Sequence, residues 1–279
     1  MCWNHGQVTK ARVYSTPLCP ALDLLFLNLG KHPFPSDFPP SSQSNPNPEP
    51  FETFFRGWLV RQEEVRQLLL QATTERDCDK AREDEEARLQ GLIGRVVAHY
   101  AEYYKAKLRV VREDALIMFE PPWFTPFERN LLWIGGFKPG LALRLVRNYV
   151  TNLTEEQTRM MEDVRTEMAE EERELAAELE KVQTGPTMIS LVEMATRGRE
   201  RTNGERDEVD EQIEIVKLAV ETLVECADYL RCKTALKIMD ILNPSQNLKF
   251  LLAITQLQLR VCNWGLQREA ESRNDNGRH

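Results

Sequence analysis

Residues 89–111 read LQGLIGRVVAHYAEYYKAKLRVV. Apolar and aromatic side chains recur in this stretch at spacings of three and four residues, which places them on one face of an α-helix. The strict alternation of apolar and polar residues that marks a half-buried strand is absent. The stretch therefore predicts one long helix with a buried stripe. The stripe consists of Leu89, Leu92, Ile93, Val96, Val97, Tyr100, Tyr103, Tyr104, Leu108 and Val111.

Other parts of the chain repeat this helical spacing on both sides of the first stripe. Apolar residues fall on one helical face in four further stretches, which are 51–65, 153–182, 209–239 and 248–262. Long amphipathic helices joined by short connections bury their apolar faces against one another. We therefore expect an all-α fold, a multi-helix bundle of long antiparallel helices.

Capping signals support the boundaries of these helices. Thr125 precedes Pro126 and, three residues later, Glu128; Thr154 and Asn243 likewise precede a Gln by three residues. In such a capping box the first side chain accepts a backbone N–H of the opening turn, and the later Glu or Gln reaches back. Gly185-Pro186 predicts a helix end, because proline cannot continue a helix.

Composition divides the chain into zones. Pro33 to Pro50 is rich in Pro, Ser and Asn, and such a segment cannot bury enough apolar surface to offset the entropy cost of ordering. We expect residues 1–50 to form a disordered arm, 51–267 a helical domain with an internal linker at about 185–205, and 268–279 a disordered tail.

Charge and cysteine usage argue against several classes of function. The formal net charge of −8 disfavours autonomous binding to a phosphate backbone. The six cysteines form no CxxC pair and no histidine cluster accompanies them, so we expect no metal site. No apolar stretch reaches membrane-spanning length, and no constellation of catalytic residues is visible. We expect a non-enzymatic protein without a cofactor, located in the nucleus, the cytoplasm or both.

One segment could serve as a partner surface. It combines an aromatic cluster with a basic stripe at helical spacing, and its candidate residues are Tyr100, Tyr103, Tyr104, Lys105, Arg109 and Arg112. The competing interpretation is that the tyrosines pack in the core and the cations form a solvated face. His99 beside them could ligate a metal or haem iron, but it lacks a second histidine at helical spacing, which favours a structural role.

The Gly-rich segment 133–140, WIGGFKPG, matches no phosphate-binding loop. We interpret it as a corner between two helices, with Trp133 buried and positive φ at Gly135 or Gly136. The residues expected to shape the fold at and around this corner are Trp58, Trp123, Trp133, Gly135, Gly136 and Pro139.

Several segments, taken in order, resemble the plant DOG1 domain. They include residues 51–62 (FETFFRGWLVRQ), His99-Tyr100 with Tyr103-Tyr104 and Lys107, and the WIGG ending at Gly136. The C-terminal part contributes 228–231 (DYLR), 250–253 (FLLA) and Trp264. The resemblance spans about residues 51–267, and Lys138 and Gly140 depart from it where the family has Arg and Ser.

The resemblance implies a function that periodicity alone does not indicate. The domain occurs after a basic-leucine zipper in the TGA class of transcription factors, and alone in proteins linked to seed dormancy and abscisic-acid signalling. Residues 1–50 hold no basic helix and no leucine heptads, so the chain resembles the stand-alone type. We therefore expect an interaction module that binds signalling or transcription proteins and reaches DNA only indirectly.

Two alternatives remain open. One is a sensor that binds a lipid-like or haem-like molecule between its helices. The other is direct sequence-specific DNA binding, as inherited from the TGA class. Homo-oligomerisation is open as well.

Overall fold

The computed structural model describes residues 50–74, 82–196 and 203–276, and within these ranges the chain is helical without a β-strand. The expected all-α class is confirmed. The expected arm, apart from Pro50, lies outside the described residues. The elements are α2 (Phe51–Thr74), α3 (Arg82–Glu113), η1 (Ala115–Met118), α4 (Pro126–Arg129), α5 (Gly140–Tyr149), α6 (Glu155–Thr184), α7 (Pro186–Thr196), α8 (Asn203–Ile241) and α9 (Pro244–Asn276).

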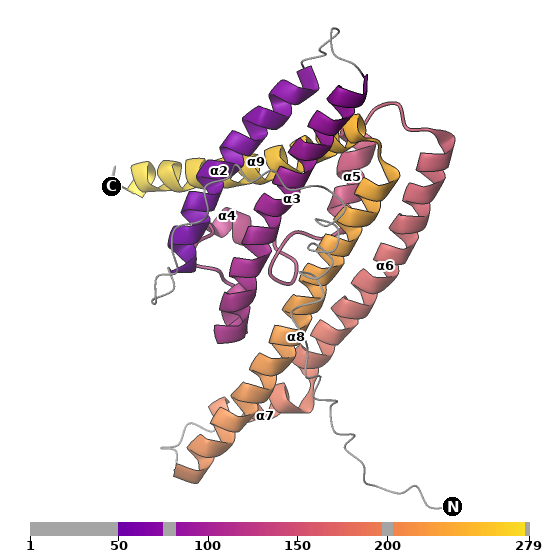
Figure 1. Ribbon diagram of the computed structural model, residues 1–279. Coiled ribbons are helices and arrows are strands. Elements are labelled where there is room, and N and C mark those ends of the chain that lie inside the picture. Colours follow the sequence, from indigo (N-terminus) through magenta and orange to yellow (C-terminus); the bar gives the residue numbers. More distant parts are fainter. Residues whose placement is uncertain (1–49, 75–81, 197–202, 277–279) are drawn as a thin grey trace, which may run out of the picture.

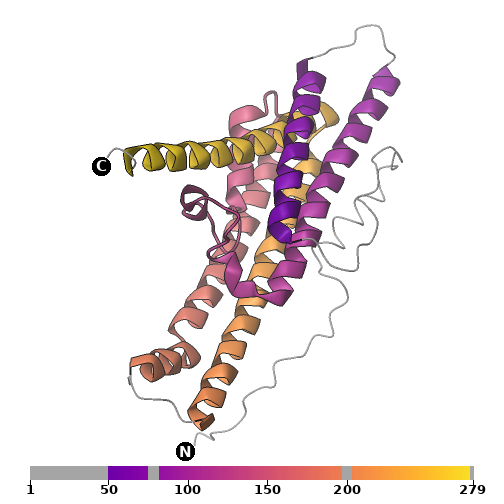
Figure 2. The same ribbon diagram turned by 90° about the vertical axis from the view of Figure 1, so that its left-hand side faces the viewer.

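The long helices form antiparallel pairs. Helices α2 and α3 lie side by side, as do α6 and α8, and α9 crosses the long helices at a steep angle (Figures 1 and 2). The short helix α7 packs between the far ends of α6 and α8. The bundle therefore has two pairs of helices tied together by a crossing C-terminal helix.

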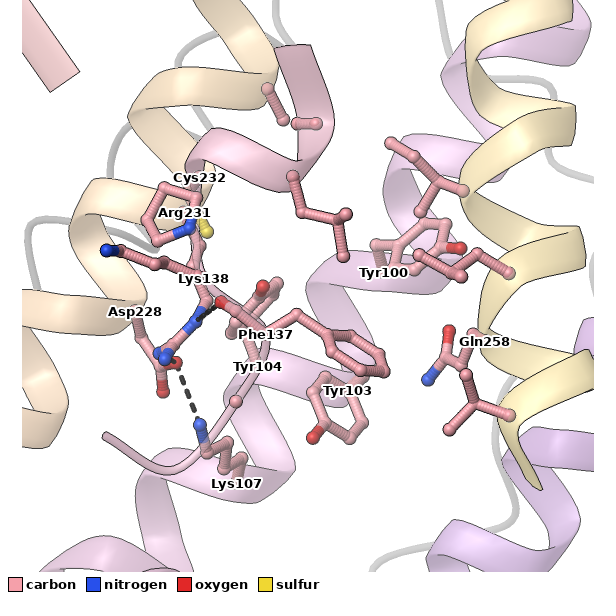
Figure 3. Close-up of a pocket in the computed structure, with 18 of the residues that line it drawn as sticks. Tyr100, Tyr103, Tyr104, Lys107, Phe137, Lys138, Asp228, Arg231, Cys232 and Gln258 are labelled. Carbon is pink, nitrogen blue, oxygen red and sulfur yellow. Dashed lines mark hydrogen bonds and ion pairs between the residues drawn. The ribbon is translucent and has the colours of Figure 1, made fainter. Parts of the chain in front are cut away.

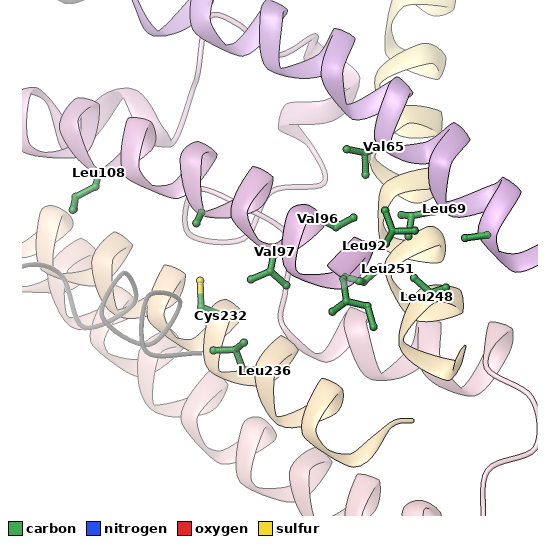
Figure 4. Packing of buried hydrophobic residues seen from close by; sticks show 13 residues of the cluster. Val65, Leu69, Leu92, Val96, Val97, Leu108, Cys232, Leu236, Leu248 and Leu251 are labelled. Atoms are coloured by element: carbon green, nitrogen blue, oxygen red, sulfur yellow. The ribbon is translucent and has the colours of Figure 1, made fainter. Parts of the chain in front are cut away.

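The central core lies where α2, α3, α8 and α9 meet (Figure 4). Leu69 of α2 and Leu248 of α9 are almost completely buried there, beside Val96 of α3. Leu236 of α8 belongs to the same cluster. The long stripe quoted first from the sequence thus forms the inner face of α3, as its spacing predicted.

The predicted helix starts are confirmed. The Thr125 side chain accepts from the backbone of Glu128 while the Glu128 carboxylate accepts from the backbone of Thr125, and Thr154 pairs with Gln157 in the same way. At α9, the Asn243 Oδ1 accepts from the Gln246 backbone N–H at 2.9 Å. Reciprocal capping satisfies donors that a helix terminus would otherwise leave unpaired.

Two expected boundaries were wrong. The expected linker at about 185–205 contains helix α7, whose Met188 and Leu191 pack against the apolar cluster formed by α8, the end of α3 and η1. The expected tail from residue 268 is helical through Asn276. There Arg268 lies over the Phe127 ring at 5.0 Å, and Glu269 pairs with Arg273 one turn later. Such contacts extend a helix beyond its apolar stripe.

Candidate functional site

A pocket of ≈ 200 Å³ opens between α3, α8, α9 and the 133–139 corner (Figure 3). Its α3 wall comprises Tyr100, Tyr103, Tyr104 and Lys107, which share one helical face because they are three or four residues apart. Most of the remaining lining is aliphatic or aromatic. A cluster of charged groups lies at the end formed by Asp228 and Arg231 of α8, Lys107 and the corner, while Gln258 lies on the α9 side.

The three tyrosines have different hydrogen bonding. The Tyr100 hydroxyl accepts from Gln62 Nε2 at 2.6 Å and lies 3.2 Å from the Thr255 hydroxyl, so it ties α3 to α2 and α9. The hydroxyls of Tyr103 and Tyr104 make no hydrogen bond to any residue that the structure describes. Burial raises the pKa of Tyr100 to about 12, and burial also raises the pKa of Tyr103 and Tyr104. All three therefore stay protonated and able to donate at neutral pH.

The backbone of the 133–139 corner contains two consecutive residues with positive φ. Ile134 has φ of 44° and Gly135 has φ of 69°, and Trp133 and Gly136 exchange backbone hydrogen bonds. The predicted positive φ is confirmed at Gly135. Trp133 is only half-buried, contrary to expectation: its ring packs at the edge of two apolar clusters and lies 5.6 Å from the Arg231 Cζ.

Arg231 holds the corner in place. Its guanidinium donates to the carbonyls of Phe137, at 2.7 Å, and Ile134, at 2.9 Å, and also to that of Trp133. A Cβ on Gly136 would lie 2.9 Å from the Arg231 Cζ, so a larger residue would displace this guanidinium from the corner. The corner conformation thus depends on a residue almost one hundred positions later in the chain.

Lys107 and Asp228 complete a buried charge cluster. Lys107 is 2% exposed, and its ammonium donates to Asp228 Oδ1 at 2.8 Å and to the Gly135 carbonyl at 2.7 Å. The same Asp228 oxygen accepts from Arg231 at 2.5 Å. Burial lowers the pKa of Lys107 from its ordinary value, and the Asp228 carboxylate opposes that shift.

The structure separates the six candidate surface residues into two groups. Tyr100, Tyr103 and Tyr104 face the pocket, whereas Lys105 and Arg109 are exposed on the opposite face of α3. Arg112 is exposed on that face as well, and it pairs with Glu225 of α8 at 3.3 Å. The tyrosines and the cations therefore cannot form one continuous surface.

His99 is part of the packing between α2 and α3. It is almost fully buried, stacks on Trp58 at 4.6 Å and lies 2.9 Å from the Gln62 side-chain oxygen. Burial lowers the pKa of His99 to about 4. Among the described residues no group of His, Cys, Asp and Glu is placed to hold a metal ion. The same residues contain no helix long and apolar enough to cross a membrane.

The remaining expected structural residues surround this region. Trp58 is completely buried and donates from Nε1 to the His99 carbonyl at 3.0 Å. Trp123 is half-buried against Phe51, with ring centroids 4.5 Å apart, and Pro139 is buried at the start of α5.

Sequence reasoning did not identify Lys107, Asp228 and Arg231 as a cluster. Lys107 and Asp228 are 121 residues apart, and no periodic pattern links such distant charges. The signal present in the sequence was Lys107 itself, a cation three residues after Tyr104 on the helix face predicted to be buried. A buried lysine requires a partner, which predicts a carboxylate elsewhere in the chain.

Comparisons with known proteins place this geometry in context. The family model DOG1, described as seed dormancy control, matches residues 64–148, which contain α3 and the corner. Protein ZW2 of Arabidopsis thaliana is 31% identical over 223 residues, covering 78% of this chain and 97% of that protein. Protein RESPONSE TO ABA AND SALT 1, also from Arabidopsis thaliana, is 30% identical and covers 76% of this chain and 93% of that protein.

Similarity extends to transcription factors at lower identity. Transcription factor TGA5 of Arabidopsis thaliana is 25% identical over 213 residues, and the match covers 76% of this chain and 62% of that protein. The match therefore covers nearly the whole length of ZW2 and of RESPONSE TO ABA AND SALT 1, and only part of TGA5.

Proposed function

Because this chain belongs to the DOG1 family, we propose that it is a non-enzymatic regulatory module that binds protein partners in seed dormancy and abscisic-acid signalling. The family description names seed dormancy control, and one relative is named for its response to ABA and salt. The likeness to TGA5 supports a setting in transcription regulation, and with it a nuclear place of action.

The observation that carries this proposal is a cationic stripe on α3, defined as Lys105, Arg109 and Arg112. Lys105 and Arg109 are exposed and form no ion pair with a described residue. The stripe leads to η1 and the turn after it, where Leu116 and Phe119 are 38% and 41% exposed. Unpaired cations beside exposed apolar side chains are suited to a partner segment that carries both acidic and apolar residues.

Arg112 adds to the stripe despite its ion pair. Its side chain is 46% exposed, and an exposed pair such as Arg112–Glu225 contributes only about 0–1 kcal/mol. A partner carboxylate can therefore compete for Arg112 at little cost. The tyrosines lie on the inner face of α3, where they line the pocket, and they do not touch the partner.

Charge reversal tests this surface. We expect Lys105→Glu combined with Arg109→Glu to abolish partner capture, because the stripe then repels acidic segments. The matched control is Arg144→Glu with Arg147→Glu, two exposed cations of α5 that also lack an ion pair to a described residue.

The measurement is affinity purification from plant seed extract with quantitative mass spectrometry, followed by titration of each recovered partner against the wild-type and variant proteins. Partners that the control retains and the stripe variant loses, with binding that weakens as salt rises, support the proposal. Equal capture by both variants refutes the stripe as the interface.

A second candidate function, a small-ligand sensor, is favoured by the pocket. A cavity of about 150 Å³ holds one benzene molecule, so the ≈ 200 Å³ present here suits a single substituted ring or a short chain. A haem macrocycle is several times larger than one ring. His99, the one residue considered as an iron ligand, does not line the pocket. The structure thus favours a small apolar ligand over a haem-like one.

A further inference from the structure

The polar end of the pocket carries more positive than negative charge. Lys107 and Arg231 both donate to one oxygen of Asp228, and all three side chains are at least 89% removed from solvent. Lys138, the other cation of the lining, already pairs with Glu172 at 3.3 Å, and Glu128 lies with Thr125 and Cys262 beside α9. One buried cation is therefore left without a counter-charge at this end.

A buried charge without a partner is costly, because the low polarity of the interior disfavours the ionised form. Burial lowers the pKa of Lys107 because of this cost. A single negative charge entering the pocket would offset it, whereas a cation would increase it and a neutral molecule would leave it unchanged. The electrostatics of the cluster thus select an anion.

Two unused hydrogen-bond donors lie beside this charge. Tyr103 and Tyr104 keep their protons at neutral pH, and their hydroxyls have no acceptor among the described residues. Besides burial, the charge of Asp228 raises the pKa of both hydroxyls and that of Arg231 lowers it, so both hydroxyls are near the polar end. Figure 3 shows them on the α3 wall, with Phe137 reaching from the corner into the space between α3 and α9.

The rest of the pocket is mainly apolar, apart from Glu128 of α4 and Gln258 of α9. Leu145 of α5, Met239 of α8, and Leu251 and Ile254 of α9 are among its lining residues. An apolar wall opposite a small polar cluster is the usual form of a ligand site, in which burial supplies affinity and a few polar groups supply orientation. The small volume limits the apolar part to about one ring or a short chain.

We infer that this pocket binds a small apolar monocarboxylate, whose carboxylate accepts the Tyr103 and Tyr104 hydroxyls beside Arg231 and whose apolar part packs against α5, α8 and α9. A phosphate ester is disfavoured, because its second negative charge would meet no further cation. This inference rests on the second candidate function and is independent of the cationic stripe.

Binding to the full chain at pH 7 tests the inference with four probes. Benzoate and octanoate carry the predicted carboxylate on a ring and on a chain. Benzyl alcohol and benzylammonium keep the ring with a neutral and a positive head. We expect saturation-transfer NMR and calorimetry to show binding of at least one carboxylate, with at least tenfold weaker binding of the alcohol and no binding of the ammonium.

Tyrosine-to-phenylalanine variants locate the ligand. Tyr103→Phe and Tyr104→Phe keep each ring and remove only the hydroxyl, so the packing is retained. A hydrogen bond to a charged group contributes about 1.5–3 kcal/mol, which corresponds to roughly a tenfold loss of affinity or more per hydroxyl. Tyr149→Phe, on an exposed tyrosine of α5, is the matched control and should bind like the wild type.

Three outcomes would overturn the inference. They are failure of both carboxylates to bind at millimolar concentration, equal or tighter binding of benzyl alcohol or benzylammonium, and unchanged carboxylate affinity in the double Tyr103→Phe, Tyr104→Phe variant. Circular dichroism of each variant establishes that it is folded. Because no protein partner is present, none of these outcomes bears on the cationic stripe.

Discussion

Asp228→Asn removes one negative charge from the buried cluster while almost preserving the shape of the side chain. In the wild type, one Asp228 oxygen accepts from Lys107 at 2.8 Å and from Arg231 at 2.5 Å. In the variant, the amide oxygen can still accept, but two buried cations lose their only carboxylate among the described residues. Loss of one partner from a buried ion pair costs about 3–5 kcal/mol, and we expect a loss of that size in the free energy of unfolding.

The pH dependence of this loss identifies its cause. Without Asp228, the pKa of Lys107 should fall further below its ordinary value, because burial is then unopposed. The native variant therefore binds fewer protons than the native wild type as pH rises. The stability difference between the two proteins should consequently shrink between pH 7 and pH 9.5, when the variant lysine can become neutral.

Urea denaturation followed by far-UV circular dichroism measures both effects. Glu225→Gln is the control, since it breaks the exposed pair with Arg112 and should cost about 1 kcal/mol or less. If Asp228→Asn costs no more than this control, or if its cost does not change with pH, the cluster is not the electrostatic support of the corner that we describe.

Three further predictions can be checked separately. Gly265→Ala should destabilise the protein by about 1–3 kcal/mol in thermal denaturation, because its Cβ would lie 2.0 Å from the Thr125 Oγ1 that caps α4; unchanged stability would contradict that contact. The pKa of His99, lowered to about 4 by burial, makes the unfolded state bind a proton more readily, so stability should fall by up to about 3 kcal/mol between pH 6.5 and pH 4; His99→Asn should remove this part of the pH dependence. Fluorescence anisotropy at physiological salt should show no preference for a plant bZIP site over a scrambled duplex, since the exposed α3 cations can neutralise few phosphates; submicromolar specific binding that weakens in Arg109→Ala would establish direct DNA recognition.

The helices could be predicted from the sequence because their signals are local. The stripe of residues 89–111 sets the inner face of α3, and the capping boxes at Thr125 and Thr154 place two helix starts within the chain. Local signals failed where a helix had little apolar periodicity. Residues 186–196 and 268–276 are helical through tertiary contacts and side-chain pairs, which a stripe pattern does not register.

The candidate site was predictable only in part. The α3 side chains were identified, since they share one segment, and helical spacing already favoured tyrosines on the inner face and cations on the outer face. The pocket that the tyrosines line could not be predicted, because it depends on the positions of α8 and α9. The charge cluster required contacts between residues 107 and 228, and the corner required contacts between 133 and 231. Such pairings depend on how helices pack, and a single sequence does not encode them in its spacing.

The packing of α2 along α9 has a consequence for how this protein is made. Gln62 of α2 donates to Gln258 of α9 at 2.9 Å, across 196 residues of chain. At a synthesis rate of about 5–20 residues per second, roughly 10–40 s pass between the synthesis of α2 and that of the α9 segment on which it packs. During that interval Leu69 and its neighbours lack the α9 surface that buries them, so the nascent chain exposes an apolar face. Shielding by a chaperone is therefore most needed before translation is complete.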